Sequence, residues 1–157
     1  MLQDMVDSLI QQEKLDLEIE REQDRQAAKE AYDSLMLHVQ QYLPSLWREH
    51  EKSNVVTGCM LVKKDNPNCG LNGHNTPALV LEDKFLLYFF RNSAYYQMTI
   101  SLKYGEFGMR QSYKDTFECE FNKKTCDTDF VRLLQKAEAR YSYVQEMTNL
   151  GYSWKLD

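Results

Sequence analysis

The stretch FLLYFFRNSAYYQMTISLKY, residues 85–104, decides the fold of this chain. Residues 85–90 are apolar on both strand faces, as expected for a strand that is central or covered on both sides. Asn92 and Ser93 then mark a turn. From residue 95 the residues alternate between a more apolar and a more polar face, which predicts a second, antiparallel strand. The first face holds Tyr96, Met98, Ile100, Leu102 and Tyr104, and the second holds Tyr95, Gln97, Thr99, Ser101 and Lys103.

Similar short strands flank this pair at residues 55–64, 78–81, 107–113 and 116–122. Short polar connections at residues 82–84, 105–106 and 114–115 favour neighbouring antiparallel strands. A helical apolar stripe follows from Asp127 or Thr128, and Gly151 suits the end of that helix. The sequence therefore predicts an antiparallel meander of about six strands with a long C-terminal helix packed on it.

The N-terminal segment predicts a second long helix. Residues 4–43 contain no Gly or Pro and are rich in strong helix formers. Pro44 disfavours helical geometry at Leu43, so the helix should end or kink there. Apolar residues at positions 31, 35, 39 and 43 predict that its last part packs on the sheet. The fold class is α+β, with an acidic helical segment at residues 1–51 and a body at residues 52–157.

Charge divides the chain in the same place. Residues 1–51 contain twelve Asp and Glu against five Lys and Arg, whereas residues 52–127 contain eight against ten. The net charge of −5 disfavours nucleic acid as a partner. No run of eighteen apolar residues occurs, and we expect no membrane partner.

The first helix carries the candidate partner-binding residues. An apolar tip comes first, followed by a heavily charged middle with six acids in sequence: Leu2, Met5, Val6, Leu9 and Ile10, then Glu13, Asp16, Glu18, Glu20, Glu22 and Asp24. The tip can fold back or fray, associate with a second copy as a homodimer, or bind another protein. Sustained heptads are missing over residues 13–30, which argues against a long parallel coiled coil.

We therefore predict a non-enzymatic, cytoplasmic interaction module, a small acidic regulator or inhibitor whose first helix binds a protein with a basic surface. The acids would steer association and the apolar tip would supply the anchor. One alternative is a small-molecule carrier or enzyme with an apolar cavity between the sheet and the last helix, lined by Met98, Ile100, Leu102, Phe117, Tyr141 and Val144. The other alternative is nucleic-acid binding through aromatic and basic residues on the sheet.

A long loop at residues 65–77 is the remaining candidate site, with Cys69, Gly70, Asn72, Gly73 and His74 as the residues of interest. Cys69 and His74 have the C-x4-H spacing found inside zinc knuckles, but a structural zinc site needs four ligands. The residues at the start of the chain do not resemble a signal peptide, so we expect a reducing compartment and free thiols at all four cysteines, Cys59, Cys69, Cys119 and Cys126. We predict no cofactor, no metal and no catalytic residues.

Overall fold

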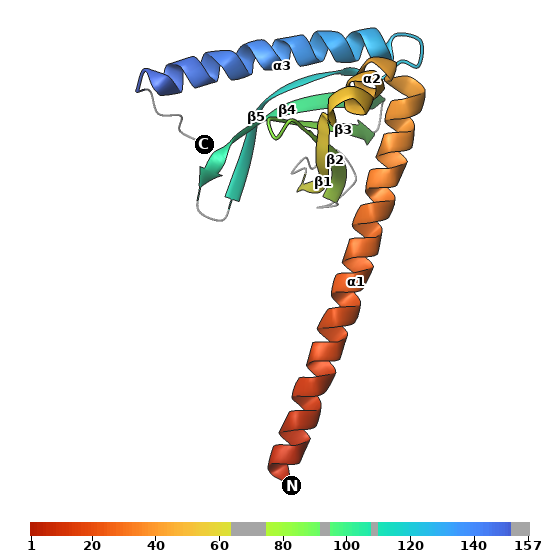
Figure 1. Cartoon of the computed structure of the whole chain (residues 1–157), viewed down its shortest axis with the longest axis vertical. Helices are drawn as coiled ribbons and strands as arrows, with labels where there is room; N and C mark the ends of the chain where they lie inside the picture. The colour runs from red at the N-terminus through yellow and green to blue at the C-terminus, as the bar shows by residue number, and fades with distance from the viewer. Residues whose placement is uncertain (64–74, 92–94, 108–109, 152–157) are drawn as a thin grey trace.

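The computed structural model describes residues 1–63, 75–91, 95–107 and 110–151. These residues form an α+β fold in which one antiparallel sheet is covered by helices from both ends of the chain (Figure 1). The strands pair in the order of the sequence, so the sheet is a simple meander. In chain order the elements are α1 (Leu2–Tyr42), α2 (Pro44–Ser53), β1 (Val56–Lys63), β2 (Asn75–Leu81), β3 (Phe85–Arg91), β4 (Tyr96–Phe107), β5 (Arg110–Glu120) and α3 (Cys126–Asn149).

The described sheet has five strands where the sequence predicts about six. The difference lies in β4 and β5, which run through both of the predicted turns at residues 105–106 and 114–115. Ser101 pairs with Thr116 and Leu102 with Lys114, so Asp115 is an extra residue in β5. Gly105 is likewise extra in β4. Glycine and short polar residues are tolerated at β-bulges as well as at turns, and the same residues therefore bend two long strands instead of ending them.

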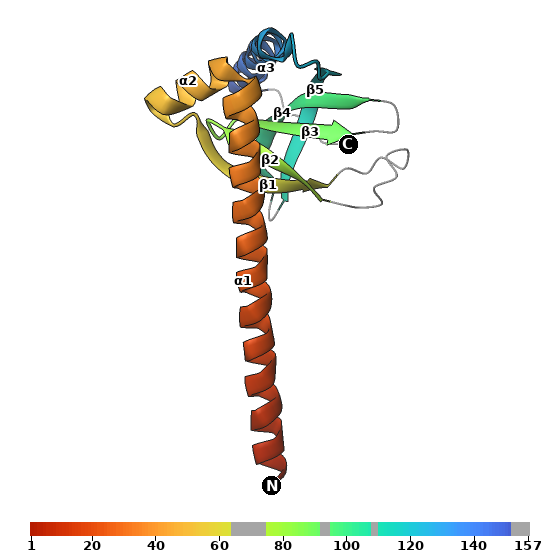
Figure 2. The same cartoon turned by 90° about the vertical axis from the view of Figure 1, so that its right-hand side faces the viewer.

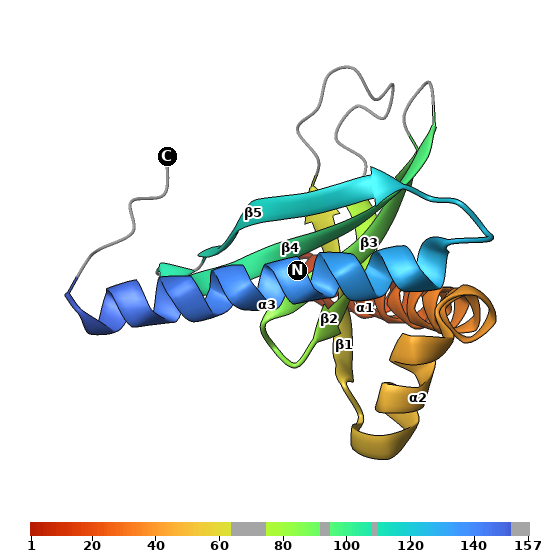
Figure 3. The ribbon, with the colours of Figure 1, turned by 90° about the horizontal axis from the view of Figure 1, so that it is seen from above.

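The prediction for residues 85–90 is confirmed, because β3 is the middle strand and all six residues are buried. The inward face of the sheet forms one core with the helices. Figure 3 shows α3 lying along β4 and β5, while α1 contacts β1 and β2. Fully buried side chains at the centre of this core come from five elements and from the junction between α1 and α2: Val39, Leu43, Leu79, Leu87, Met98, Ile100 and Ala137.

The last part of α1 packs on the sheet as predicted. Val39 and Leu43 are completely buried, and Tyr32, Leu35 and Met36 pack around them at the helical spacing of three and four residues. Helix α1 ends at Tyr42, and Pro44 occupies the first turn of α2, where its missing N–H costs nothing. The residues after Pro44 form a helix of ten residues.

Two neighbouring residues at the start of α3 close the junction between α1 and α2. The Cys126 thiol donates to the carbonyl of Tyr42 at 3.1 Å. The Asp127 carboxylate accepts from the Ser45 N–H at 2.9 Å and from the Ser45 hydroxyl at 2.6 Å. The N-cap residue of α2 is Leu43, whose side chain has no acceptor, and Asp127 therefore caps α2 from another helix. Burial raises the pKa of the Cys126 thiol, so it stays protonated and able to donate.

We predict that Asp127→Ala lowers the free energy of unfolding by about 2 kcal/mol, because it removes two hydrogen bonds to a carboxylate at the start of α2. Urea unfolding followed by circular dichroism measures this loss. Glu138→Ala, an exposed acid on the same helix, is the matched control and should change the free energy by less than about 0.5 kcal/mol. Equal losses in the two variants would show that Asp127 is not a cap.

Candidate functional site

The N-terminal part of α1 lies outside the body of the protein. Every residue from Met1 to Glu30 is exposed. At a rise of about 1.5 Å per residue this segment extends about 45 Å. Figures 1 and 2 show it running away from both the sheet and α3. The helix is therefore held at its C-terminal third and free along the rest of its described length.

The apolar tip predicted from the sequence lies on this segment, and its side chains are exposed. Its five side chains, Leu2, Met5, Val6, Leu9 and Ile10, are between 45 and 79% exposed. They are spaced by three and four residues, so they form one stripe on one face of the helix. An apolar stripe that nothing within the described structure covers is typical of a surface that binds another macromolecule.

Four acids of the exposed part of α1 share one face, and that face carries no base. Starting from Val6 and Leu9, the same helical stripe continues by steps of three and four through Glu13, Asp16, Glu20 and Asp24. Four of the six predicted acids thus lie in line with the apolar tip. Glu18 and Glu22 point to another side. We call the set Val6, Leu9, Glu13, Asp16, Glu20 and Asp24 the α1 stripe.

The bases of the same segment follow a second line at Lys14, Arg21, Arg25 and Lys29, about a third of a turn away. The α1 stripe is therefore negative and apolar without interruption by a positive side chain. The net charge does not reveal this separation of the stripe from the line of bases. It follows from the helix being continuous from Leu2 to Tyr42.

One flank of helix α3 presents a row of bases. Arg132, Lys136 and Arg140 recur every four residues, all three are exposed, and they form a row on one flank of the helix. An open groove of about 630 Å³ lies between this flank and β5, and none of the described residues that line it is acidic. The lining consists of Thr116, Phe117, Lys136, Ala139, Arg140 and Tyr143. The spacing of the bases is a signal in the sequence, but the groove depends on how β5 packs beside them.

A second groove, of about 460 Å³, lies where α2, α3 and the β2–β3 turn meet. Its floor includes Leu46 and Phe130, but its rim mixes bases such as Arg48 and Lys52 with three acids, Glu49, Glu82 and Glu138. Mixed charge gives it no preference for either sign of partner.

The residues expected to line an apolar cavity are packed in the core instead. Met98, Ile100, Leu102 and Val144 are buried among one another and among their neighbours. Of the six predicted lining residues, Phe117 alone borders one of the two grooves described above.

Three residues on the more polar face of β4 are not presented to solvent. Gln97, Thr99 and Ser101 are buried and hydrogen-bonded within the sheet. The Gln97 amide donates to Glu118 at 2.8 Å, and the Ser101 hydroxyl lies 3.3 Å from that of Tyr88 and 3.1 Å from that of Thr116. Burial raises the pKa of Tyr88, so it remains a neutral phenol in this network. Hydroxyls used in this way stabilise the sheet and leave little for a ligand.

The predicted loop residues Cys69, Gly70, Asn72, Gly73 and His74 lie outside the described residues. Cys59, Cys119 and Cys126 are free thiols. Burial raises the pKa of all three, which disfavours the thiolate that metal binding or nucleophilic attack requires. Among the described residues, no group of three His, Cys, Asp or Glu side chains could hold a metal ion. In the same part of the chain, no helix has the length and hydropathy needed to cross a membrane.

Comparison of the chain with models of known protein families, with curated proteins and with solved structures finds no match.

An unusual histidine lies at the root of the projecting helix. The His38 ring packs against Phe89 at 4.5 Å, Tyr42 at 4.8 Å and Phe121 at 5.2 Å between ring centroids. Its buried Nε2 has no hydrogen-bond partner within the described structure. Burial lowers the pKa of His38, so the folded protein favours the neutral ring. Protonation would place a charge among aromatic rings that hold α1 to the sheet.

We predict that this histidine makes stability depend on pH. In the unfolded chain the ring has a pKa of about 6.5, so below that pH the unfolded state binds a proton that the folded state resists. The contribution is fully present above about pH 6.5 and is lost as the pH falls toward the lower, folded-state pKa. His38→Phe should lose less free energy of unfolding than the wild type in this window. Urea unfolding between about pH 7.5 and 5.5 tests it, and parallel curves would contradict it.

Proposed function

We propose that this protein is a non-enzymatic interaction module, a regulator or inhibitor that binds a partner protein through the projecting part of α1. One observation carries the proposal. Residues 2–30 of α1 leave the body as a regular, exposed helix, with an apolar tip continuous with an acidic stripe. A helix that lays such a face on a partner is a common mode of protein recognition.

The two halves of the exposed segment suit different tasks. Burying a large aliphatic side chain from full exposure is worth about 1.5–3 kcal/mol, so the five tip residues can supply most of the affinity. The exposed acids contribute little affinity each, since surface ion pairs are worth about 0–1 kcal/mol. Their value lies in steering a basic partner surface and in fixing the register of the complex.

The partner surface that this stripe fits is therefore a shallow groove with an apolar end and a row of Lys or Arg. The body of the protein holds only the C-terminal third of α1, through the core and the junction with α3, so the rest of the helix is available for that contact. We infer a binding role and assign no reaction to any residue.

Photo-crosslinking tests this proposal in the full-length chain. A photoreactive amino acid replaces Leu9 on the apolar stripe in one variant and Gln11 on the opposite face in a matched control; both positions are exposed. In the cells that make the protein, we expect a discrete protein adduct from position 9 and at least about fivefold less from position 11. Asp16→Lys with Glu20→Lys should weaken the adduct at position 9.

Both positions are exposed, and they lie only two residues apart. Equal labelling from both, or no protein adduct from position 9, would contradict a specific contact through this face of the helix.

A further inference from the structure

We propose that the partner of the α1 stripe is a second copy of this chain, and that the stripe docks antiparallel to α3 in the groove beside β5. This inference rests on the proposed function, because it names the basic surface that the helix binds. It adds a receptor surface, an orientation and a residue-by-residue register.

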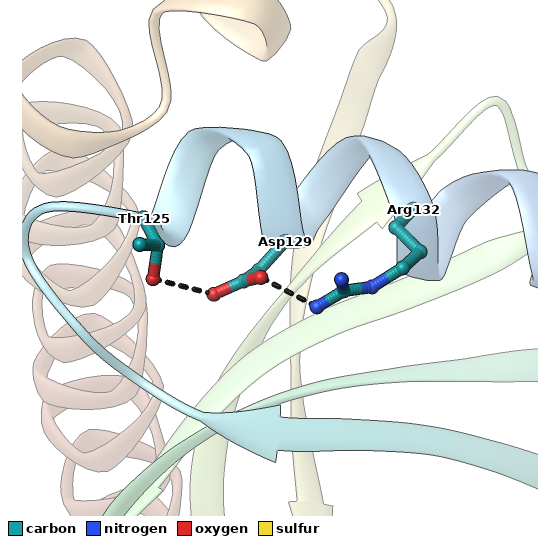
Figure 4. Close-up of polar contacts among 3 residues, drawn as sticks. All are labelled: Thr125, Asp129 and Arg132. Carbon is teal, nitrogen blue, oxygen red and sulfur yellow. Dashed lines mark hydrogen bonds and ion pairs between the residues drawn. The ribbon is translucent and has the colours of Figure 1, made fainter.

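The receptor surface is the exposed flank of α3. Asp129 accepts a hydrogen bond from the Thr125 hydroxyl at 2.8 Å and forms an ion pair with Arg132, which holds the first base of the row in place (Figure 4). The Arg132 side chain remains 56% exposed. Lys136 and Arg140 continue the row along the groove.

The same flank becomes apolar toward the C-terminal end of α3. Tyr143 and Leu150 are 46% and 67% exposed, and the half-buried Met147 lies between them. Basic residues thus come first along α3 and apolar residues follow. Along α1 the order is reversed, since the apolar tip comes first and the acids follow. Therefore only an antiparallel pairing of the two helices places the acids of α1 against the bases of α3 and the apolar residues of one helix against those of the other.

In one antiparallel register, each residue of the α1 stripe faces a residue of α3 or its C-cap that is complementary in charge or hydropathy. Both stripes advance by the same series of three- and four-residue steps, so they can face one another along their whole length. Three acid–base pairs, one acid–phenol pair and two apolar pairs result: Asp24 with Arg132, Glu20 with Lys136, Asp16 with Arg140, Glu13 with Tyr143, Leu9 with Met147, and Val6 with Leu150. Matched spacing alone is common to helices, but the order of charge and hydropathy is particular to these two.

The contact is between chains. Helix α1 is fixed to the body near the first turn of α3, and its exposed segment runs away from α3 (Figure 1). A chain cannot place its own stripe in its own groove without breaking α1. The two surfaces differ, so each copy offers one stripe and one groove, and the contact is heterologous.

A charge exchange tests the proposal. One variant carries Asp16→Arg and Glu20→Arg, and the other carries Lys136→Glu and Arg140→Glu. Sedimentation velocity at about 0.1 M salt should show wild-type self-association that weakens as salt rises. Each variant alone should raise the dissociation constant on the order of 30-fold, because two attractive pairs become repulsive. An equimolar mixture should restore association, since each altered surface then meets its opposite.

The mixture guards against misfolding, because an unfolded variant cannot be rescued by a second one. Glu18→Arg with Glu22→Arg, which alters two acids off the stripe, is the matched control and should associate as the wild type does. A wild type that stays monomeric, or a mixture that stays dissociated, overturns self-docking. If position 9 still crosslinks to a different protein, the proposed function stands and only its partner is wrong. If position 9 crosslinks to nothing, both are wrong.

Discussion

The junction at Leu43 and Pro44 is the constraint on which the rest of the structure depends. Proline ends α1, and the chain must turn within one residue while Leu43 remains in the core. Cys126 and Asp127 satisfy the two helix ends that this turn leaves open. Residues 82 and 84 positions apart in sequence are thereby joined at one point, and the direction in which α1 leaves the body is fixed there.

The length of α1 has a physical consequence for function. The core buries its last third, and the remaining residues gain nothing from tertiary packing. An isolated helix of this length is marginal in water, but here nucleation has already occurred in the anchored part, and extension from it is inexpensive. Side-chain pairs such as Gln12 with Asp16 and Arg25 with Glu22 add small increments. The outcome is a helix stable enough to project and exposed enough to bind.

Periodicity predicted most of the fold, because the patterns were strong and local. The apolar run in β3, the alternation in β4 and the proline after α1 each depend on neighbouring residues alone. The number of strands was wrong because Gly105 and Asp115 suit a bulge as well as a turn, and pairing with the neighbouring strand decides between them. The candidate site could be predicted in part: the tip was evident, whereas the line of acids required an unbroken helix. The groove beside α3 could not be predicted, since it arises where β5 and α3 meet. Nothing in the pattern of residue 38 indicated a neutral histidine among aromatic rings.

Small-angle X-ray scattering of the dilute protein at high salt tests the central claim, that α1 projects from the body, most directly. A compact chain of 157 residues would have a radius of gyration of about 15 Å. A projecting helix of 41 residues, about 60 Å long, predicts a clearly larger value and a pair-distance distribution with a long tail. A radius of gyration near 15 Å with a symmetric distribution would mean that the helix folds back, and would contradict the account.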